Sequence, residues 1–168
     1  MNVSYQWLKS LVPVDWSPEE LAERLTFAGL SVEQVSYFNH GIKNVIVAEI
    51  LSVEKHPDPS KTKWHVCQVN TGKNTVTIVC GAPNVRPGIK VPLAQVGAEL
   101  AGGINIGPAD KGGVTSYGML CSSVELDLPD GLALADSDGG IFILPQECTV
   151  GEDIVTALQL DDAILEFE

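Results

Sequence analysis

Basic side chains are scarce in this sequence: ten Lys and Arg stand against 22 Asp and Glu, for a formal net charge of −12. Long apolar runs are missing too, since no stretch approaches the roughly 18 uncharged apolar residues of a membrane span. The amino terminus lacks the basic-then-apolar layout of a signal peptide. These absences exclude a membrane protein or membrane partner and predict a cytoplasmic location. A hydrophobic share of 45% with 19% charged residues indicates a folded chain.

Catalytic and metal-binding patterns are also absent. Four cysteines are spread singly, with no C-x-x-C pair and no histidine at metal-ligand spacing: Cys67, Cys80, Cys121 and Cys148. We interpret all four as small buried apolar side chains. The sequence contains no nucleophile elbow, no triad spacing among its three histidines and no Walker-type glycine loop. We therefore predict that the chain itself is non-catalytic and holds neither a metal nor a cofactor.

The basic side chains are concentrated in the middle of the sequence. Eight of the ten lie within residues 42–121, beside five acidic ones, whereas residues 122–168 carry twelve acidic side chains and no basic one. Phosphate binding depends on Lys and Arg that neutralise the nucleic-acid backbone. The middle segment is therefore where a nucleic acid would bind. The alternative is an ordinary density of surface charge, because the excess is small beside an acidic neighbour.

Two short helices are predicted near the amino terminus. Ser4 precedes an apolar spacing that suits a helix over residues 5–12. Ser17 and Glu20 then form a capping box, with proline at the first helical position between them. A second helix over residues 18–28 follows, and a glycine ends it.

From residue 31 onward the pattern changes to β-branched alternation interrupted by Gly, Pro and Asn. Such a pattern favours a small all-β barrel. The predicted strands cover residues 31–38, 44–53, 64–70, 75–79, 90–96, 104–106 and 141–145, with a hairpin turn at 71–74. We expect the acidic segment 126–140 to be a surface loop. Residues 162–168 are expected to form an extended strand whose partners are missing.

Two short motifs carry a family resemblance. The first is Ile-Val-Cys-Gly-Ala-Pro-Asn-Val at residues 78–85, and the second is Gly-Met-Leu-Cys-Ser at residues 118–122. With His56-Pro57 and the glycine pair at 102–103, they resemble the tRNA-binding domain of the bacterial phenylalanyl-tRNA synthetase β subunit. Residues 1–40 resemble the start of the same subunit. Free-standing tRNA-binding proteins carry a similar domain.

This resemblance implies a mainly β protein with an α+β part. An OB-fold β-barrel of residues 41–149 would be inserted into a small, discontinuous α+β domain of residues 1–40 plus 150–168, truncated at its C-terminal part. The implied function is that of an accessory tRNA-binding fragment of the phenylalanine–tRNA ligase β subunit, a class II synthetase, supporting aminoacylation in the full enzyme. The implied partners are tRNA, the rest of the β subunit and the α subunit. ATP and magnesium would be used elsewhere in the enzyme.

The resemblance also points to candidate RNA-binding residues: Lys55, His56, Lys61, Lys63, Asn84, Arg86, Lys90, Lys111 and Ser122. Arg86 stands in a Pro-Gly turn, where its guanidinium either contacts phosphate or is a solvent-exposed loop charge. Asn84 either reads a base edge or caps its turn. His56 either faces RNA or hydrogen-bonds the loop backbone. Trp64 either stacks on a base or packs in the core.

The sequence departs from the family at two places. Thr62 follows Lys61 where relatives have leucine, with two extra residues, so this loop is remodelled. Between the glycine pair and the second motif, relatives have a dense basic run, whereas only Lys111 is basic here. Losing phosphate contacts lowers both affinity and its salt dependence. Two alternatives to tRNA binding by this chain therefore stay open: a docking module for the rest of the enzyme, and a free-standing tRNA-binding protein. The resemblance of residues 1–40 argues against the latter.

Overall fold

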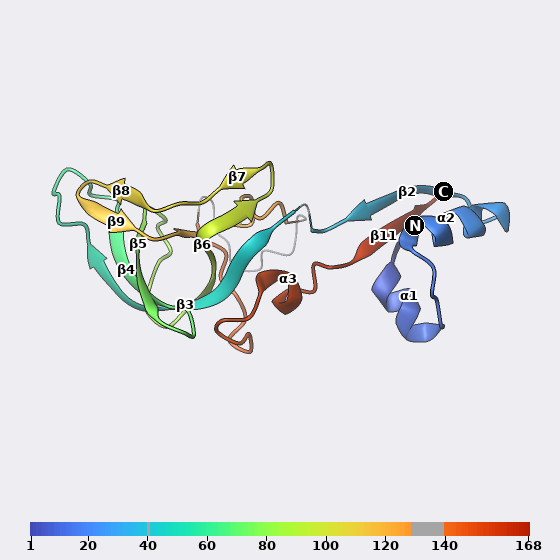
Figure 1. Cartoon of the computed structure of the whole chain (residues 1–168), viewed down its shortest axis with the longest axis horizontal. Helices are drawn as coiled ribbons and strands as arrows, with labels where there is room; N and C mark the ends of the chain where they lie inside the picture. Colours follow the sequence, from blue (N-terminus) through green and yellow to red (C-terminus); the bar gives the residue numbers. More distant parts are fainter. Residues whose placement is uncertain (40, 129–139) are drawn as a thin grey trace. The chain divides into compact units, whose positions relative to one another are not determined.

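The computed structural model describes residues 1–39, 41–128 and 140–168. The chain divides into two compact units, Met1–Asn39 with Gln159–Glu168, and His40–Leu158. Figure 1 labels most of the strands and helices of both. Most of the acidic segment 126–140, expected to be a surface loop, lies outside the described residues.

The first unit contains two helices that begin where the sequence predicts. α1 (Tyr5–Leu11) starts after Ser4, whose hydroxyl accepts a backbone N–H of the first turn. α2 (Pro18–Phe27) starts with the complete capping box: Glu20 N donates to Ser17 Oγ at 3.2 Å, and Ser17 N donates to the Glu20 carboxylate at 3.0 Å. These bonds satisfy N–H groups that have no partner within the helix. No helix in the described residues is both long enough and apolar enough to cross a membrane.

The first unit also holds a three-stranded antiparallel sheet in the order β1-β11-β2. Its strands are β1 (Asn2–Ser4), β11 (Ala163–Phe167) and β2 (Val32–Tyr37). β11 is the central strand, so the expectation that residues 162–168 lack strand partners is wrong. Tyr5, Leu21 and Leu165 form the centre of a small core between this sheet and the helices.

The second unit is built on a sheet in the order β10-β6-β3-β4-β5, with β7 paired to β6. Its strands are β3 (Lys43–Lys55), β4 (His65–Asn70), β5 (Thr75–Cys80), β6 (Lys90–Leu100), β7 (Ile104–Asn105) and β10 (Met119–Leu120). A separate hairpin consists of β8 (Ala109–Lys111) and β9 (Val114–Ser116). The turn predicted at residues 71–74 joins β4 to β5, with Thr71 N donating to Asn74 O at 2.9 Å.

The sheet of the second unit is strongly curved (Figure 1), and single hydrogen bonds, in place of a strand ladder, join its last strand to the β8–β9 hairpin. Tyr117 N donates to Thr77 O, and Val79 N donates to Ser116 Oγ, each at 3.0 Å. These contacts bring β5 against the end of β9 and the residue that follows it. Ile50, Ile78 and Leu93 fill the interior. The unit thus has the mainly β, OB-type architecture expected from the sequence, with an open seam.

The segment 140–158 returns along the second unit. The strand predicted at 141–145 does not form; Leu144 makes one isolated bridge, donating its N–H to Lys90 O at 2.8 Å. Gly151 N donates to Val47 O, and Val47 N donates to Glu152 O, each at 2.8 Å. α3 (Ile154–Ala157) follows. Because these bonds attach the segment to β3, residues 150–158 belong to the second unit and not, as expected, to the first.

The cysteines are buried apolar side chains, with one exception. Cys67, Cys80 and Cys121 lie in the interior of the second unit, whereas Cys148 is only partly buried. Burial raises the pKa of the Cys67 and Cys121 thiols to about 12. Neutral thiols are poor nucleophiles and poor metal ligands. No cluster that could hold a metal ion is found among the described residues.

Gly118 provides a test of the second unit's packing. Its φ is +133°, and a Cβ there would lie 2.5 Å from the backbone oxygen of Ala94. We expect Gly118→Ala to lower the free energy of unfolding by about 2–4 kcal/mol, because it adds both backbone strain and a clash that no side chain can relieve. Gly107→Ala is the matched control: a Cβ there meets nothing within 4 Å, so its effect should stay within about 0.5 kcal/mol. Urea unfolding followed by circular dichroism measures both, and equal effects would contradict this account.

Candidate nucleic-acid interface

A buried histidine fixes the loop between β3 and β4. The side chain of His56 is 6% exposed. Its Nε2 lies 2.7 Å from the carbonyl oxygen of Lys111, and its Nδ1 accepts the N–H of Asp58 at 3.1 Å. This pattern assigns the neutral tautomer with the proton on Nε2. Both ring nitrogens are thus used to join the loop to the β8–β9 hairpin, so His56 positions the loop, in line with the second of its two sequence interpretations.

The loop is further closed by its own hydrogen bonds. Ser60 N donates to the Asp58 carboxylate at 2.8 Å, and Lys61 N donates to Asp58 O at 3.0 Å. Hydrogen bonds from Ser60, followed by a smaller effect of nearby Lys61, lower the pKa of the Asp58 carboxyl. His56 N donates to Trp64 O at 3.1 Å and closes the loop at its base. The turn is therefore defined before any ligand binds.

Trp64 contacts both the buried His56, which anchors the loop, and the loop cation Lys61. Its ring meets the His56 ring edge-on at 5.7 Å between centroids, and Lys61 Nζ lies 4.9 Å from the Trp64 centroid. A Cβ at Gly81 would lie 3.4 Å from the indole, so the strand end after β5 passes close to the ring. Trp64 is partly buried. It therefore packs as a support under Lys61 and presents only part of its surface for stacking.

The β8–β9 hairpin approaches the loop at Gly112. A Cβ there would lie 3.0 Å from His56 Cε1 and 3.7 Å from Lys61 Cε, and the φ of +66° also favours glycine. Lys111 precedes this glycine and is exposed, as is Lys63 on the loop. The sequence analysis did not identify Gly112 as the point where the hairpin meets the loop, although a Gly-Gly pair after a lysine is typical of a hairpin turn. We call Lys61 and Lys63 on the loop, together with Lys111 on the hairpin that His56 joins to it, the loop cluster.

Three other predicted residues use their polar groups inside the fold. Lys90 Nζ donates to the carbonyl oxygens of Gln146 and Cys148, each at 2.6 Å. Asn84 forms a two-way pair with the Ile141 peptide, accepting its N–H and donating to its oxygen at 2.9 Å each. The hydroxyl of Ser122 donates to a carboxylate oxygen of Glu125 at 2.6 Å. The contacts of Lys90 and Asn84 attach residues 141–148 to the barrel, and that of Ser122 holds a turn within the segment after β10. Each side chain therefore has a structural role.

The remaining two candidates are exposed. Lys55 ends β3, opposite His65 on β4. Arg86 stands in the exposed loop between β5 and β6. Its guanidinium makes no hydrogen bond to any residue that the structure describes. Contact with RNA stays a prediction for both, as it does for the loop cluster.

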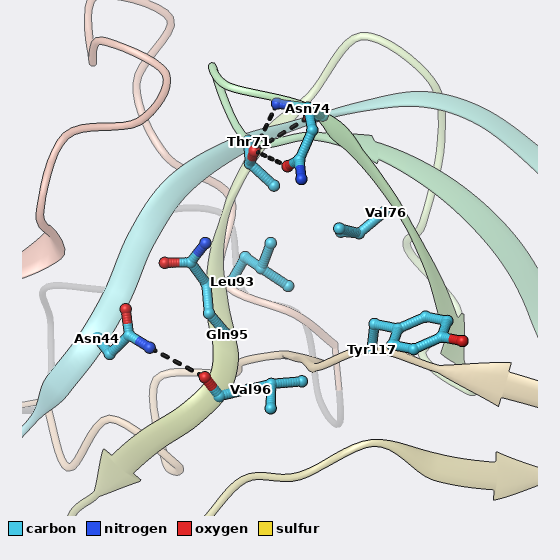
Figure 2. Close-up of a pocket in the computed structure, with 8 residues that line it drawn as sticks. All are labelled: Asn44, Thr71, Asn74, Val76, Leu93, Gln95, Val96 and Tyr117. Atoms are coloured by element: carbon cyan, nitrogen blue, oxygen red, sulfur yellow. Dashed lines mark hydrogen bonds between the residues drawn. The ribbon is translucent and has the colours of Figure 1, made fainter.

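A hollow of about 310 Å³ on the second unit was not predicted from the sequence (Figure 2). Its lining consists of Asn44, Thr71, Asn74, Val76, Leu93, Gln95, Val96 and Tyr117. These residues come from β3, β5, β6, the β4–β5 turn and the segment after β9, which explains why no local motif reveals them. Asn44 has a positive φ of 57°, an unusual backbone conformation that Asn adopts more readily than most residues. This backbone conformation marks Asn44 as unusual in the structure, but a positive φ cannot be read from the sequence.

Comparison with known proteins matches residues 45–153 to the family described as "Putative tRNA binding domain". The phenylalanine–tRNA ligase β subunit of Pseudomonas fluorescens is 46% identical over 168 residues, which is 100% of this chain and 20% of that protein. The same subunit of Streptococcus pneumoniae is 43% identical over 99% of this chain and 20% of that protein. The chain therefore spans about a fifth of the length of the curated relatives it matches.

Among solved structures, the MetRS related protein from Pyrococcus horikoshii is similar with a TM-score of 0.41 and 24% identity, over 64% of this chain and 85% of that chain. A likeness this distant carries no argument about function.

Asn84 gives a test of the structural role assigned above. Asn84→Ala removes both hydrogen bonds to the Ile141 peptide, which is buried. We expect the free energy of unfolding to fall by about 2–3 kcal/mol, because two buried polar groups lose their partner. Arg86→Ala, two residues away and exposed, should change it by less than about 0.5 kcal/mol. Urea unfolding of the two variants decides the matter; an unchanged stability of Asn84→Ala would show that the pair is dispensable.

Proposed function

The chain belongs to the tRNA-binding domain family through residues 45–153, and from that membership we propose that it acts as the tRNA-contacting accessory region of a phenylalanine–tRNA ligase β subunit. The observation that carries the proposal is the loop cluster. Lys61 and Lys111 lie on two segments joined by one buried histidine. Two lysines carried by connected segments of an OB-type barrel suit the RNA backbone.

The electrostatics of the chain favour a modest affinity. Its net charge is −12, and phosphate contacts are confined to a few lysines. Lys90 is used in the fold, which leaves fewer cations for RNA than the sequence alone suggested. Each lost phosphate contact lowers both the affinity and its dependence on salt. The chain would therefore add position and shape recognition to tRNA binding, and other parts of the enzyme would supply most of the affinity.

The chemistry of aminoacylation would take place elsewhere in such an enzyme. Under this proposal, ATP and magnesium are used by other parts, and the chain meets the rest of the β subunit and the α subunit as protein partners. The proposal draws support from relatives that match the entire chain and are five times longer.

A second candidate function, docking, is favoured by exposed apolar side chains on the first unit. Trp7 and Leu11 are 59% and 63% exposed, and they stand one helical turn apart on α1. Phe27 at the end of α2 is 84% exposed. Aromatic side chains left in water are typical of the centre of a protein interface. The first unit would then hold the chain in the enzyme while the second unit faces RNA.

A salt titration tests RNA contact. We expect the affinity of the chain for tRNA to fall with rising KCl, with a log–log slope of about 2–3 in magnitude if three lysines contact phosphate. Lys61→Ala, Lys63→Ala and Lys111→Ala should each lower that slope by about 0.7–0.9, because each removes one phosphate contact. Fluorescence anisotropy of labelled tRNA measures the slopes.

Lys9→Ala is the matched control, since Lys9 lies on α1 of the first unit, over the Tyr5 ring. Its slope should equal that of the unchanged chain. Absence of binding at low salt would refute direct tRNA contact, and equal losses in all four variants would show a non-specific charge effect.

The docking function has its own test. Trp7→Ala should weaken binding of the chain to the purified α subunit, or to the rest of the β subunit, by about tenfold or more, because a central aromatic side chain is lost from the interface. Val124→Ala removes a side chain on the second unit that is 83% exposed, and it should leave binding unchanged. Surface plasmon resonance measures both; a chain indifferent to either partner would count against docking.

A further inference from the structure

We propose that the hollow between Tyr117 and Gln95 is a pocket for one unpaired nucleobase of a bound RNA. The inference rests on the proposed function and deepens it, because it names a base-binding site apart from the loop cluster. The residues that carry it surround the hollow in Figure 2, where Val76 points into the open space, with Thr71 and Asn74 above it and Tyr117 below it.

The floor of the hollow is formed by apolar side chains that are buried or partly buried. Leu93 is fully buried, Val76 is partly buried, and Val96 is 46% exposed at the rim. Tyr117 is 50% exposed, and its backbone N–H donates to Thr77 O at 3.0 Å across the barrel seam. This bond fixes the backbone from which the ring projects, and the exposed part of the residue is open to a ligand. A planar aromatic group can stack on such a ring at little cost in conformational entropy.

The lining carries no charged side chain. A phosphate, a carboxylate or a metal ion would lose its hydration there without a compensating charge. A nucleobase is neutral at ordinary pH, planar and edged with donors and acceptors, so it fits a lining that combines aliphatic, aromatic and amide groups. The volume of about 310 Å³ also suits a ligand at the lower end of small-molecule pockets.

The amides that line the hollow have unused hydrogen-bonding groups. Asn44 Nδ2 donates to Val96 O at 3.2 Å, which holds the side chain and leaves its oxygen to accept. Asn74 Oδ1 accepts from Thr71 Oγ1 at 2.6 Å, which leaves its NH2 group to donate. In the part of the chain that the structure describes, the Gln95 amide makes no hydrogen bond. Two oriented amides and one adaptable one are what recognition of a base edge requires.

A cation stands next to the hollow and not within it. Thr71 also lines a neighbouring hollow, together with Gly72 and Lys73. Lys73 is exposed at the tip of the β4–β5 turn. A nucleotide whose base occupies the first hollow would carry its phosphate outside it, within the field of this lysine. Because a base must leave its stack to enter, the occupant comes from a single-stranded part of the RNA.

The experiment uses the full chain, labelled with ¹⁵N, and free nucleosides as probes. Adenosine, guanosine, cytidine and uridine are added separately while the side-chain NH2 signals of Asn74 and Gln95 are followed by NMR. We expect at least one nucleoside to shift these signals, and ribose to leave them in place. Tyr117→Ala should weaken nucleoside binding about tenfold or more, whereas Tyr117→Phe should retain it, since stacking needs the ring and not the hydroxyl.

Tyr37→Ala is the control, because Tyr37 is an exposed tyrosine of the first unit. The same variants are then titrated with tRNA. If tRNA binds and Tyr117→Ala changes neither its affinity nor that of any nucleoside, the pocket is refuted while RNA binding stands. If tRNA fails to bind at low salt but nucleosides still shift the pocket signals, RNA binding is refuted and the base site stands. Shifts that ribose reproduces, or that Tyr117→Ala retains, overturn the base assignment.

Discussion

The architecture of the second unit depends on one strand, β3, that pairs with two neighbouring strands. β3 pairs with β6 over residues 43–49 and with β4 over residues 49–55. The register shifts between Lys43 and Val45 and again between Ile50 and Ser52. Irregularities of this kind bend a strand and increase its twist. The two shifts therefore bend β3 at the centre of a sheet whose last strand, β5, returns to contact Ser116 and Tyr117.

The same strand places the candidate sites at its two ends. The first shift falls at Asn44, whose positive φ directs a hydrogen bond from its side chain to Val96 at the edge of the hollow. At the other end, β3 passes directly into His56 and the loop that it anchors. A cationic surface and a neutral hollow are thus separated by the length of one strand. Under the two proposals, a nucleic acid that crossed the barrel along β3 would place phosphates at one end of the strand and a base at the other.

Sequence patterns predicted the local elements well and the long-range ones poorly. The capping box of Ser17 and Glu20 is a contact over three residues, so the helix start could be read directly. The pairing of β11 joins residues at opposite ends of the chain, and no local pattern encodes that partner. The segment near Leu144 has a strand-like composition, yet one bridge to Lys90 is all it forms, because tertiary contacts override propensity.

The candidate site shows the same division. Residue type identified lysines, an asparagine and a serine, but not whether a polar group faces water or the fold. Lys90 and Asn84 bind backbone atoms more than fifty positions away, a use that only the folded chain reveals. The sequence left open whether His56 faces RNA or hydrogen-bonds the backbone. Its burial and its bond to the Lys111 carbonyl favour the backbone role. The hollow beside Tyr117 is assembled from five separate segments, so no motif could announce it.

The central position of β11 also sets an order of events on the ribosome. β1 and β2 emerge early, but the strand that joins them leaves the exit tunnel only after the entire second unit has been made. Until then the two helices lack the central strand of the sheet against which they pack. The inserted unit, whose pairings are closer in sequence, can fold in the meantime. The second unit can therefore fold before the first, whose central strand follows it in the sequence.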